Sequence, residues 1–156
     1  MSFIFKKRNS VEEVEEGIEL QPKFDINGLI PVITTNEFNH QILMHGYMNE
    51  EALKKSIQTG YAHYWSRSRK CIWKKGETSG LKQKIIEMKI DDDQDCIWIE
   101  VKVSGNGASC HVGYKSCFYR KVEFKDKSNI KLKFTEHKKV FNPKDVYGNA
   151  PNPTKL

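Results

Sequence analysis

Two groups of side chains that bind metals occur in one short stretch, residues 91–117. The first group is acidic: Asp91, Asp93 and Asp95 alternate, with Asp92 between the first two. In an extended strand, alternate side chains lie on one face about 6.5 Å apart, so these three carboxylates would lie together and Asp92 would face the other way. Neighbouring carboxylate oxygens are suitable ligands for a hard divalent cation. A solvated acidic turn is the alternative interpretation.

The second group contains thiols. Cys110 and Cys117 have six residues between them, and His111 follows the first. Such a set can bind zinc, although the spacing differs from the C-x2-C of zinc ribbons and also suits two buried cysteines. Oxygen and sulfur ligands within 27 residues of a short chain favour a metal-dependent activity.

Length and composition describe an ordinary single-domain protein. The chain has 156 residues, 38% hydrophobic and 29% charged, enough for one core. Basic residues from Lys6 onward come too early for a signal peptide, and no apolar run nears the ~20 residues that span a membrane. We therefore expect a cytoplasmic protein with reduced cysteines. The net charge of +6 and pI near 9.1 suit an anionic partner: a nucleic acid, a membrane surface or a phosphorylated metabolite.

Hydrophobic patterns predict one main helix among many strands. Asn49 can cap a helix over 50–58 that ends at Gly60. Strands are expected at 29–35, 41–47, 61–66, 71–75, 84–90, 96–103, 118–124 and 131–135. This pattern predicts an α+β single domain with a mostly antiparallel, barrel-like sheet. We expect an N-terminal segment at 1–28, the main domain at 29–148 and a C-terminal tail at 149–156.

Basic, hydroxyl and aromatic residues cluster between the helix and the acidic run. Arginine forks and hydroxyls commonly bind phosphate, and a tryptophan can stack on a base. A basic hairpin with its aromatic residues in the core is the alternative. The residues concerned are Trp65, Ser66, Arg67, Ser68, Arg69, Lys75, Glu77, Thr78 and Ser79.

Several of these motifs together resemble the phosphoribosyl-AMP cyclohydrolases of histidine biosynthesis. The matching segments appear in the family's order and span roughly 29–148. They are Met48–Leu53, Trp65–Arg69, Lys75–Gly80, the spaced aspartates, Cys110–His111, Ser116–Arg120 and Val140–Pro143.

The resemblance implies a homodimer with two metals at each site. A zinc ion is held by three cysteines contributed from both subunits, and Cys110 and Cys117 match two of them. A magnesium ion is held by three aspartates, matched by Asp91, Asp93 and Asp95. The third zinc cysteine of the family lies between the first two aspartates, where this sequence has Asp92.

We expect Asp92 to take the place of that cysteine. A carboxylate has the same single charge as a thiolate, and zinc binds both. The alternative is a site with the two cysteines plus water or His111. Cys96 would lie about 13 Å from Asp92 along an extended strand, too far to replace the thiol. Since oxygen is a harder donor than sulfur, zinc would be held less tightly, or another divalent ion would substitute.

The implied activity is hydrolysis of the adenine ring of phosphoribosyl-AMP between N1 and C6. His111 is the expected acid/base residue. The residues from Trp65 to Arg69 and from Lys75 to Ser79 named above would bind this small phosphorylated substrate, and a nucleic-acid partner is not expected. Two alternatives stay open: a related purine-nucleotide hydrolase with an altered metal, and a non-catalytic nucleotide- or RNA-binding module.

Overall fold

The computed structural model describes residues 3–156 and shows the expected mixture of strands with one main helix. The main helix is α2, and α1 and α3 are shorter. In chain order the elements are α1 (Val11–Glu16), β1 (Leu29–Asn36), β2 (Ile42–Asn49), α2 (Glu50–Thr59), β3 (His63–Ser66), β4 (Cys71–Lys74), β5 (Gln83–Ile90), β6 (Ile97–Val103), β7 (Arg120–Glu123), β8 (Lys131–Phe134) and α3 (Pro143–Tyr147).

Local sequence signals account for both ends of α2. The Asn49 side chain accepts a hydrogen bond from the Ala52 N–H at 2.8 Å and so satisfies a free donor of the first turn. Gly60 ends the helix in the left-handed region, with φ +70°. Both positions confirm the predicted start and end of this helix.

The central sheet is open, so the expectation of a barrel-like sheet is wrong. Its four strands have the order β2-β1-β6-β5. All its pairs are antiparallel except β1 with β6, which are parallel. The remaining strands form two separate hairpins, β3–β4 and β7–β8. A barrel would require the edge strands β2 and β5 to pair with each other, and no such pairing occurs among the described residues.

The hydrophobic core lies on one face of this sheet. Ile30 and Val32 of β1 and Ile99 of β6 are fully buried there, beneath Leu53 of α2 and Tyr64 of β3. The alternate residues of the same strands point to the other face.

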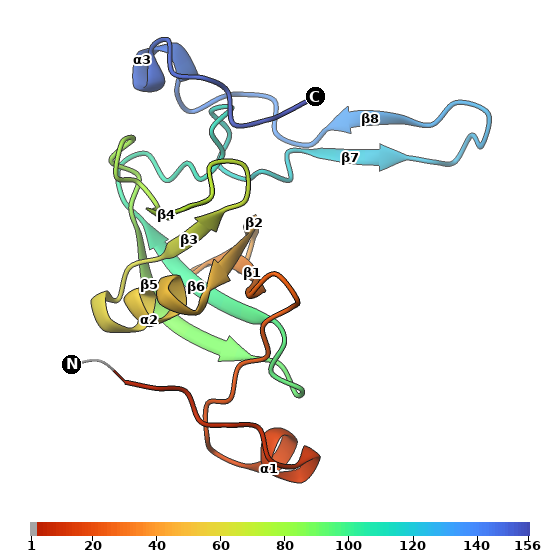
Figure 1. The fold of residues 1–156 in the computed structure, drawn as a ribbon. Helices are drawn as coiled ribbons and strands as arrows, with labels where there is room; N and C mark the ends of the chain where they lie inside the picture. Colours follow the sequence, from red (N-terminus) through yellow and green to blue (C-terminus); the bar gives the residue numbers. More distant parts are fainter. Residues whose placement is uncertain (1–2) are drawn as a thin grey trace.

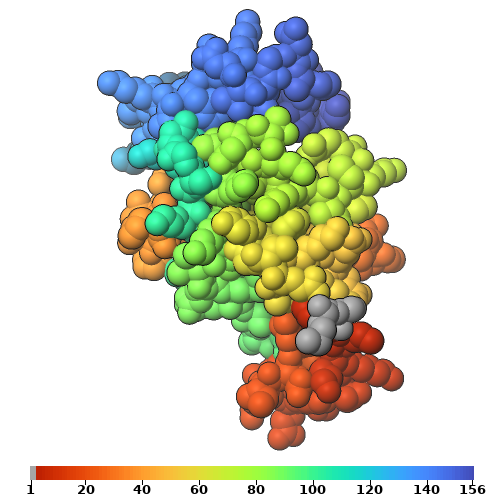
Figure 2. Space-filling model, turned by 90° about the vertical axis from the view of Figure 1, so that its left-hand side faces the viewer, coloured from red at the N-terminus to blue at the C-terminus, as the bar shows by residue number. Residues whose placement is uncertain are grey.

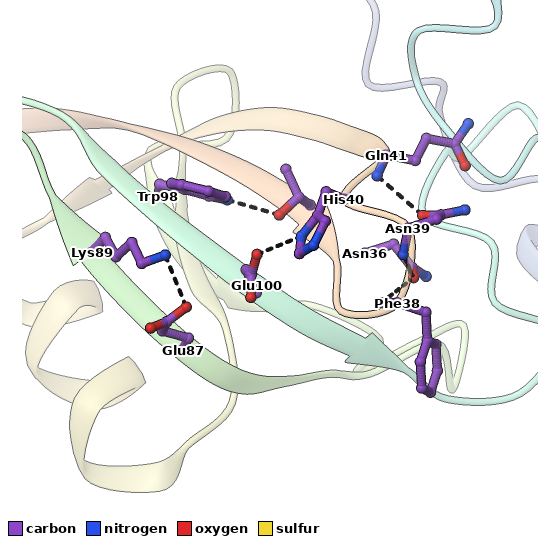
Figure 3. A network of polar contacts seen from close by, with 10 residues as sticks. Asn36, Phe38, Asn39, His40, Gln41, Glu87, Lys89, Trp98 and Glu100 are labelled. Atoms are coloured by element: carbon purple, nitrogen blue, oxygen red, sulfur yellow. Dashed lines mark hydrogen bonds and ion pairs between the residues drawn. The ribbon is translucent and has the colours of Figure 1, made fainter.

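That other face carries polar contacts (Figure 3). The Trp98 Nε1–H donates to Thr35 Oγ1 at 2.7 Å, and His40 Nδ1 lies 2.7 Å from a carboxylate oxygen of Glu100. The first contact joins β1 to β6, and the second joins the β1–β2 turn to β6.

The N-terminal segment with α1 and the C-terminal segment with α3 lie at opposite ends of the molecule (Figures 1 and 2). The N-terminal segment with α1 lies at one end, beside the turn that joins β5 to β6. The β7–β8 hairpin and α3 lie at the other, where the hairpin extends away from the body. Within residues 3–156, no helix combines the length and apolar character needed to cross a bilayer.

Candidate active site

The acidic stretch is a turn between β5 and β6, not the extended strand that the alternating aspartates predict. The Asp91 N–H donates to Cys96 O at 3.1 Å, which closes the turn, and Gln94 has φ +57°. The estimate that Cys96 lies about 13 Å away along a strand is therefore wrong, because the chain reverses direction at this point.

The turn nevertheless brings the three predicted carboxylates together. Ligand oxygens of Asp91, Asp93 and Asp95 all lie within 4.8 Å of one another. Asp91 Oδ1 also accepts the backbone N–H groups of Asp95 and Cys96, each at 2.9 Å. Desolvation, followed by the charges of Asp93 and Asp91, raises the pKa of Asp95. Three crowded carboxylates form a donor set that a hard divalent cation would neutralise.

Asp92 lies apart from this group of three. Its side chain is exposed. With Asp91 and Gln94 it lines a cavity of about 330 Å³ whose other wall is formed by residues of the N-terminal segment, among them Glu15 and Glu19. Asp92 is therefore accessible to a group that approaches from outside the chain.

Cys110 and Cys117 lie side by side. Cys110 is buried and Cys117 is exposed, and their side chains are hydrogen-bonded to each other. This bond lowers the pKa of Cys110 and raises that of Cys117, because the Cys117 S–H donates to the Cys110 thiolate. The Cys117 N–H is anchored to Leu43 O of β2 at 2.7 Å. The two sulfurs can therefore bind one ion.

A buried lysine lies beside the thiols. Lys75 is 7% exposed, and its Nζ donates to Ser109 O at 2.8 Å. Burial lowers the pKa of Lys75, while the Cys117 and Cys110 charges oppose this shift. The sequence predicts Lys75 as a substrate-binding residue, and the structure shows that its charge also acts on the thiol pair. No sequence signal separates it from the neighbouring Lys74, since the burial of Lys75, which follows β4, depends on the segments that pack around it.

His111 adjoins the same thiols and is half-buried. Desolvation and then the Lys75 charge lower its pKa, and a hydrogen bond with Asn152 opposes them. The C-terminal residues expected to form a tail thus supply a contact to the predicted acid/base residue.

The predicted arginine motif forms the β3–β4 turn. Ser66 Oγ accepts both the backbone N–H and the Nε–H of Arg69, each at 3.2 Å. The Arg67 guanidinium lies 4.3 Å from the centre of the Tyr47 ring. Arg67, Ser68 and Arg69 are exposed, as phosphate-binding groups must be.

Trp65 does not lie with the thiols. It lines a hollow of about 540 Å³ with residues at the start of α2, among them Glu50 and Lys54. Trp73, which the prediction of site residues omitted, lies near two cations: Arg69 is 5.6 Å and Lys75 is 5.9 Å from its ring centre. This tryptophan links the arginine turn to the thiol pair.

Glu77, Thr78 and Ser79 form the turn that follows β4. Glu77 and Thr78 are exposed, and Ser79 is partly buried. Gly76, with φ +85°, makes the turn possible: a Cβ at this position would lie 2.3 Å from the Lys82 nitrogen. The turn begins at Lys75 and so lies next to the thiol pair.

The β5–β6 turn, which carries the carboxylates, and the segment between β6 and β7, which carries the thiols, lie toward opposite ends of the molecule (Figure 1). The carboxylate turn precedes β6, whereas Cys117 is bonded to β2, about 10 Å across the sheet from β6 at the usual strand spacing. In the part of the chain that the structure describes, the only group of three or more potential metal ligands is the aspartate triad. Among residues 3–156, then, no third acidic, histidine or thiol group lies within 4.8 Å of both sulfurs.

Comparisons with known proteins identify the family. A sequence model described as phosphoribosyl-AMP cyclohydrolase matches residues 44–119. A phosphoribosyl-AMP cyclohydrolase of Rhodopseudomonas palustris (strain HaA2) is 48% identical over 139 residues, which is 89% of this chain and 93% of that protein. Similar matches come from Nitrobacter winogradskyi (46%, covering 88% of this chain and 94% of the relative) and Brucella canis (50%, covering 78% and 88%). This chain therefore belongs to the phosphoribosyl-AMP cyclohydrolase family.

Proposed function

We propose that two copies of this chain form a phosphoribosyl-AMP cyclohydrolase site, in which the thiol pair of one subunit faces the carboxylate turn of the other. The protein is a hydrolase of histidine biosynthesis, as its 46–50% identity to relatives of that name indicates. The single observation that carries the shared site is the thiol pair: its two sulfurs are adjacent, and among residues 3–156 no further acidic, histidine or thiol group completes a set of three ligands with them.

The donor sets fit the two metals of the family. Two hydrogen-bonded thiols at Cys110 and Cys117 are suitable for zinc. The Asp91, Asp93 and Asp95 oxygens are suitable for magnesium. Bound there, zinc supplies Lewis acidity and lowers the pKa of a water molecule.

The side chains around the thiols have separable roles. The positive charge of Lys75 favours the thiolate forms that a metal requires. His111 lies where it can exchange a proton with the attacking water or the ring nitrogen. In the reaction, the water oxygen adds to C6, the C6–N1 bond breaks, and N1 takes up a proton. The exposed Arg67, Ser68 and Arg69 would bind the substrate phosphates.

The β7–β8 hairpin supports association with a second copy. Val122 and Leu132 pair directly across it and are 53% and 51% exposed, so one face is apolar. The other face carries Lys121 opposite Lys133. Two-stranded ribbons are marginally stable alone, and an exposed apolar face marks an interface.

The position of the hairpin supports a second copy of the chain as the partner. The hairpin begins at Arg120, three residues after Cys117. A copy that brings its carboxylate turn to Cys117 must therefore approach beside the hairpin and can cover the apolar face.

Subunit complementation tests the shared site. Cys117→Ser and Asp93→Asn proteins should each be inactive when assayed alone. After the two are dissociated and reassociated together, mixed dimers contain one intact site, and activity should recover to about a quarter of wild type if pairing is random in a two-fold dimer. The assay is the ultraviolet change on ring opening. If mass spectrometry detects mixed dimers and these dimers are inactive, each site belongs to one chain.

Asp92 of the partner subunit is our candidate for the third zinc ligand. It is exposed on the carboxylate turn, and its oxygen is a harder donor than the sulfur of the family pattern. We expect zinc to be held loosely or replaced by another divalent ion, which suits service where zinc is scarce. Metal analysis of the purified protein, with activity measured on added zinc, manganese and iron, tests this. A stoichiometric zinc that resists chelators would contradict it.

The ring-opening assay also separates the enzyme from a binding module. Unchanged substrate absorbance together with salt-dependent RNA binding would favour the non-catalytic alternative. We retain a cytoplasmic location as a prediction, consistent with a small phosphorylated metabolite as substrate.

A further inference from the structure

The carboxylate turn is held from outside by the segment that precedes the first strand. Arg8 makes two of these contacts: its Nη1 donates to Gln21 O at 2.6 Å and its Nη2 to Asp93 O at 2.8 Å. The second bond reaches the backbone of the middle member of the triad, so the Asp93 carboxylate stays free to bind a cation.

Gln94 is the centre of the contact between this segment and the turn. It is 5% exposed although the three aspartates around it are exposed or half-exposed. Its Nε2 donates to Val14 O at 3.0 Å and to Glu19 O at 3.2 Å, and its Oε1 accepts the Gln21 N–H at 2.7 Å. All the hydrogen-bonding groups of this side chain are directed at the N-terminal segment rather than at a ligand.

Gln94 also has an unfavourable backbone. Its φ of +57° is uncommon for a residue with a side chain. Its carbonyl accepts the Lys23 N–H at 2.7 Å. Such a conformation persists only where surrounding contacts hold it, and here those contacts come from residues 71 to 80 positions earlier in the chain.

The segment itself is anchored to the core. Phe5 and Phe24 flank it, pack against the core cluster, and have ring centres 6.3 Å apart. Lys54 of α2 lies 5.4 Å above the Phe5 ring. The contacts to the turn are therefore supported by the body of the protein.

We propose that residues 7–23 are a clamp that sets the geometry of the carboxylate turn for its cation, with Gln94 and Arg8 as positioning residues. The clamp lies outside the region 44–119 that the family model matches. This inference rests on the proposed function, because it assigns a cation to Asp91, Asp93 and Asp95. The three carboxylates repel one another, and a turn fixed in advance does not have to be ordered against that repulsion when the cation binds.

The test measures binding of Mn²⁺ alone to the metal-free protein by calorimetry, because Mn²⁺ prefers oxygen donors. Gln94→Gly allows the positive φ without strain but removes the side-chain hydrogen bonds. Arg8→Ala removes the two hydrogen bonds of the guanidinium group. Each should weaken Mn²⁺ binding about tenfold, the usual effect of losing a group that orients metal ligands. Arg8→Lys should lie between Arg8→Ala and wild type, since it keeps one donor.

Two control variants define the highest and lowest Mn²⁺ affinities expected in this experiment. Lys6→Ala removes a charge from an exposed side chain next to the clamp. The Mn²⁺ affinity of this variant should stay within about twofold of wild type. Asp93→Asn removes a ligand and should abolish Mn²⁺ binding at the carboxylate turn. Gln94→Asn tolerates the same φ but is too short to reach both carbonyls, so it replaces Gln94→Gly if that variant fails to fold.

A second measurement distinguishes positioning from general stabilisation. In Gln94→Gly and Arg8→Ala, the Mg²⁺ concentration for half-maximal activity should rise by the factor seen with Mn²⁺, while turnover at saturating Mg²⁺ and zinc content at the thiols stay near wild type. Lower melting temperatures with unchanged Mn²⁺ affinity would overturn the clamp. If ring opening is absent in wild type, the proposed function fails, yet the Mn²⁺ titration still decides the clamp.

Discussion

Gly113→Ala is expected to damage the thiol site through the backbone. Gly113 has φ +104° and lies in the turn that presents Cys110. Its N–H donates to Cys110 O at 3.0 Å, and its carbonyl accepts the Val140 N–H at 2.7 Å. A shift at this position therefore moves a predicted zinc ligand.

The size of the effect follows from the space around the glycine. A Cβ would lie 2.4 Å from Phe141 O, whereas ordinary contacts begin near 3.4 Å, so the two must separate by about 1 Å. That movement disrupts the adjoining Val140 hydrogen bond, worth about 1 kcal/mol. Backbone strain at positive φ adds about 1 to 3 kcal/mol. We expect a loss of about 3 kcal/mol in unfolding free energy.

Gly80→Ala is the matched control. Gly80 has φ +75° with nothing within 4 Å of its added Cβ, so it reports backbone strain alone, about 1 to 2 kcal/mol. Urea unfolding of the metal-free proteins, followed by tryptophan fluorescence, measures both losses, and zinc titration follows the thiols. Equal losses in the two variants, or unchanged zinc affinity in Gly113→Ala, would refute this reasoning.

Three further outcomes are expected. Asp92→Cys should make bound zinc leave more slowly to a chelator, because a third thiolate is a softer ligand. The bond from Cys117 lowers the pKa of Cys110 from 9.0 to about 6, so the ultraviolet absorbance of its thiolate should appear in metal-free protein as pH rises through about 6. The contribution of that bond to stability is present above pH 9 and is lost as pH falls through about 6. Leu132→Glu should shift the protein to monomers and abolish most activity, because it places a charge on the apolar face of the hairpin.

Each of these outcomes has a control. Cys71→Asp adds a carboxylate at an exposed cysteine and should leave zinc release unchanged, and zinc loss at the wild-type rate in Asp92→Cys would argue against that residue as a ligand. In Cys110→Ser the absorbance near pH 6 should vanish; its persistence would assign it to another thiol. Lys131→Glu places the same charge on the polar face of the hairpin, and monomers from that variant would show that the apolar face is not what associates.

The sequence alone was sufficient wherever the physics is local or the motif is contiguous. The Asn49 cap and the Gly60 stop of α2 depend on bonds within four residues, and they were predicted correctly. The aspartate triad and the cysteine pair were also predicted, although the triad meets through a turn rather than a strand. The family resemblance also rested on contiguous motifs, and the similarity to known relatives confirms the family.

Only the tertiary structure decided what depends on distant residues. The packing of the turns that follow β3 and β4 determines that Lys75 is buried at the thiols while Arg67 stays exposed. The contacts of Gln94 with Val14 and Gln21 join residues more than 70 positions apart, and no local pattern encodes that pairing. The open sheet likewise follows from how strands pair in space, because hydrophobic alternation gives each strand a buried face but does not choose its neighbour.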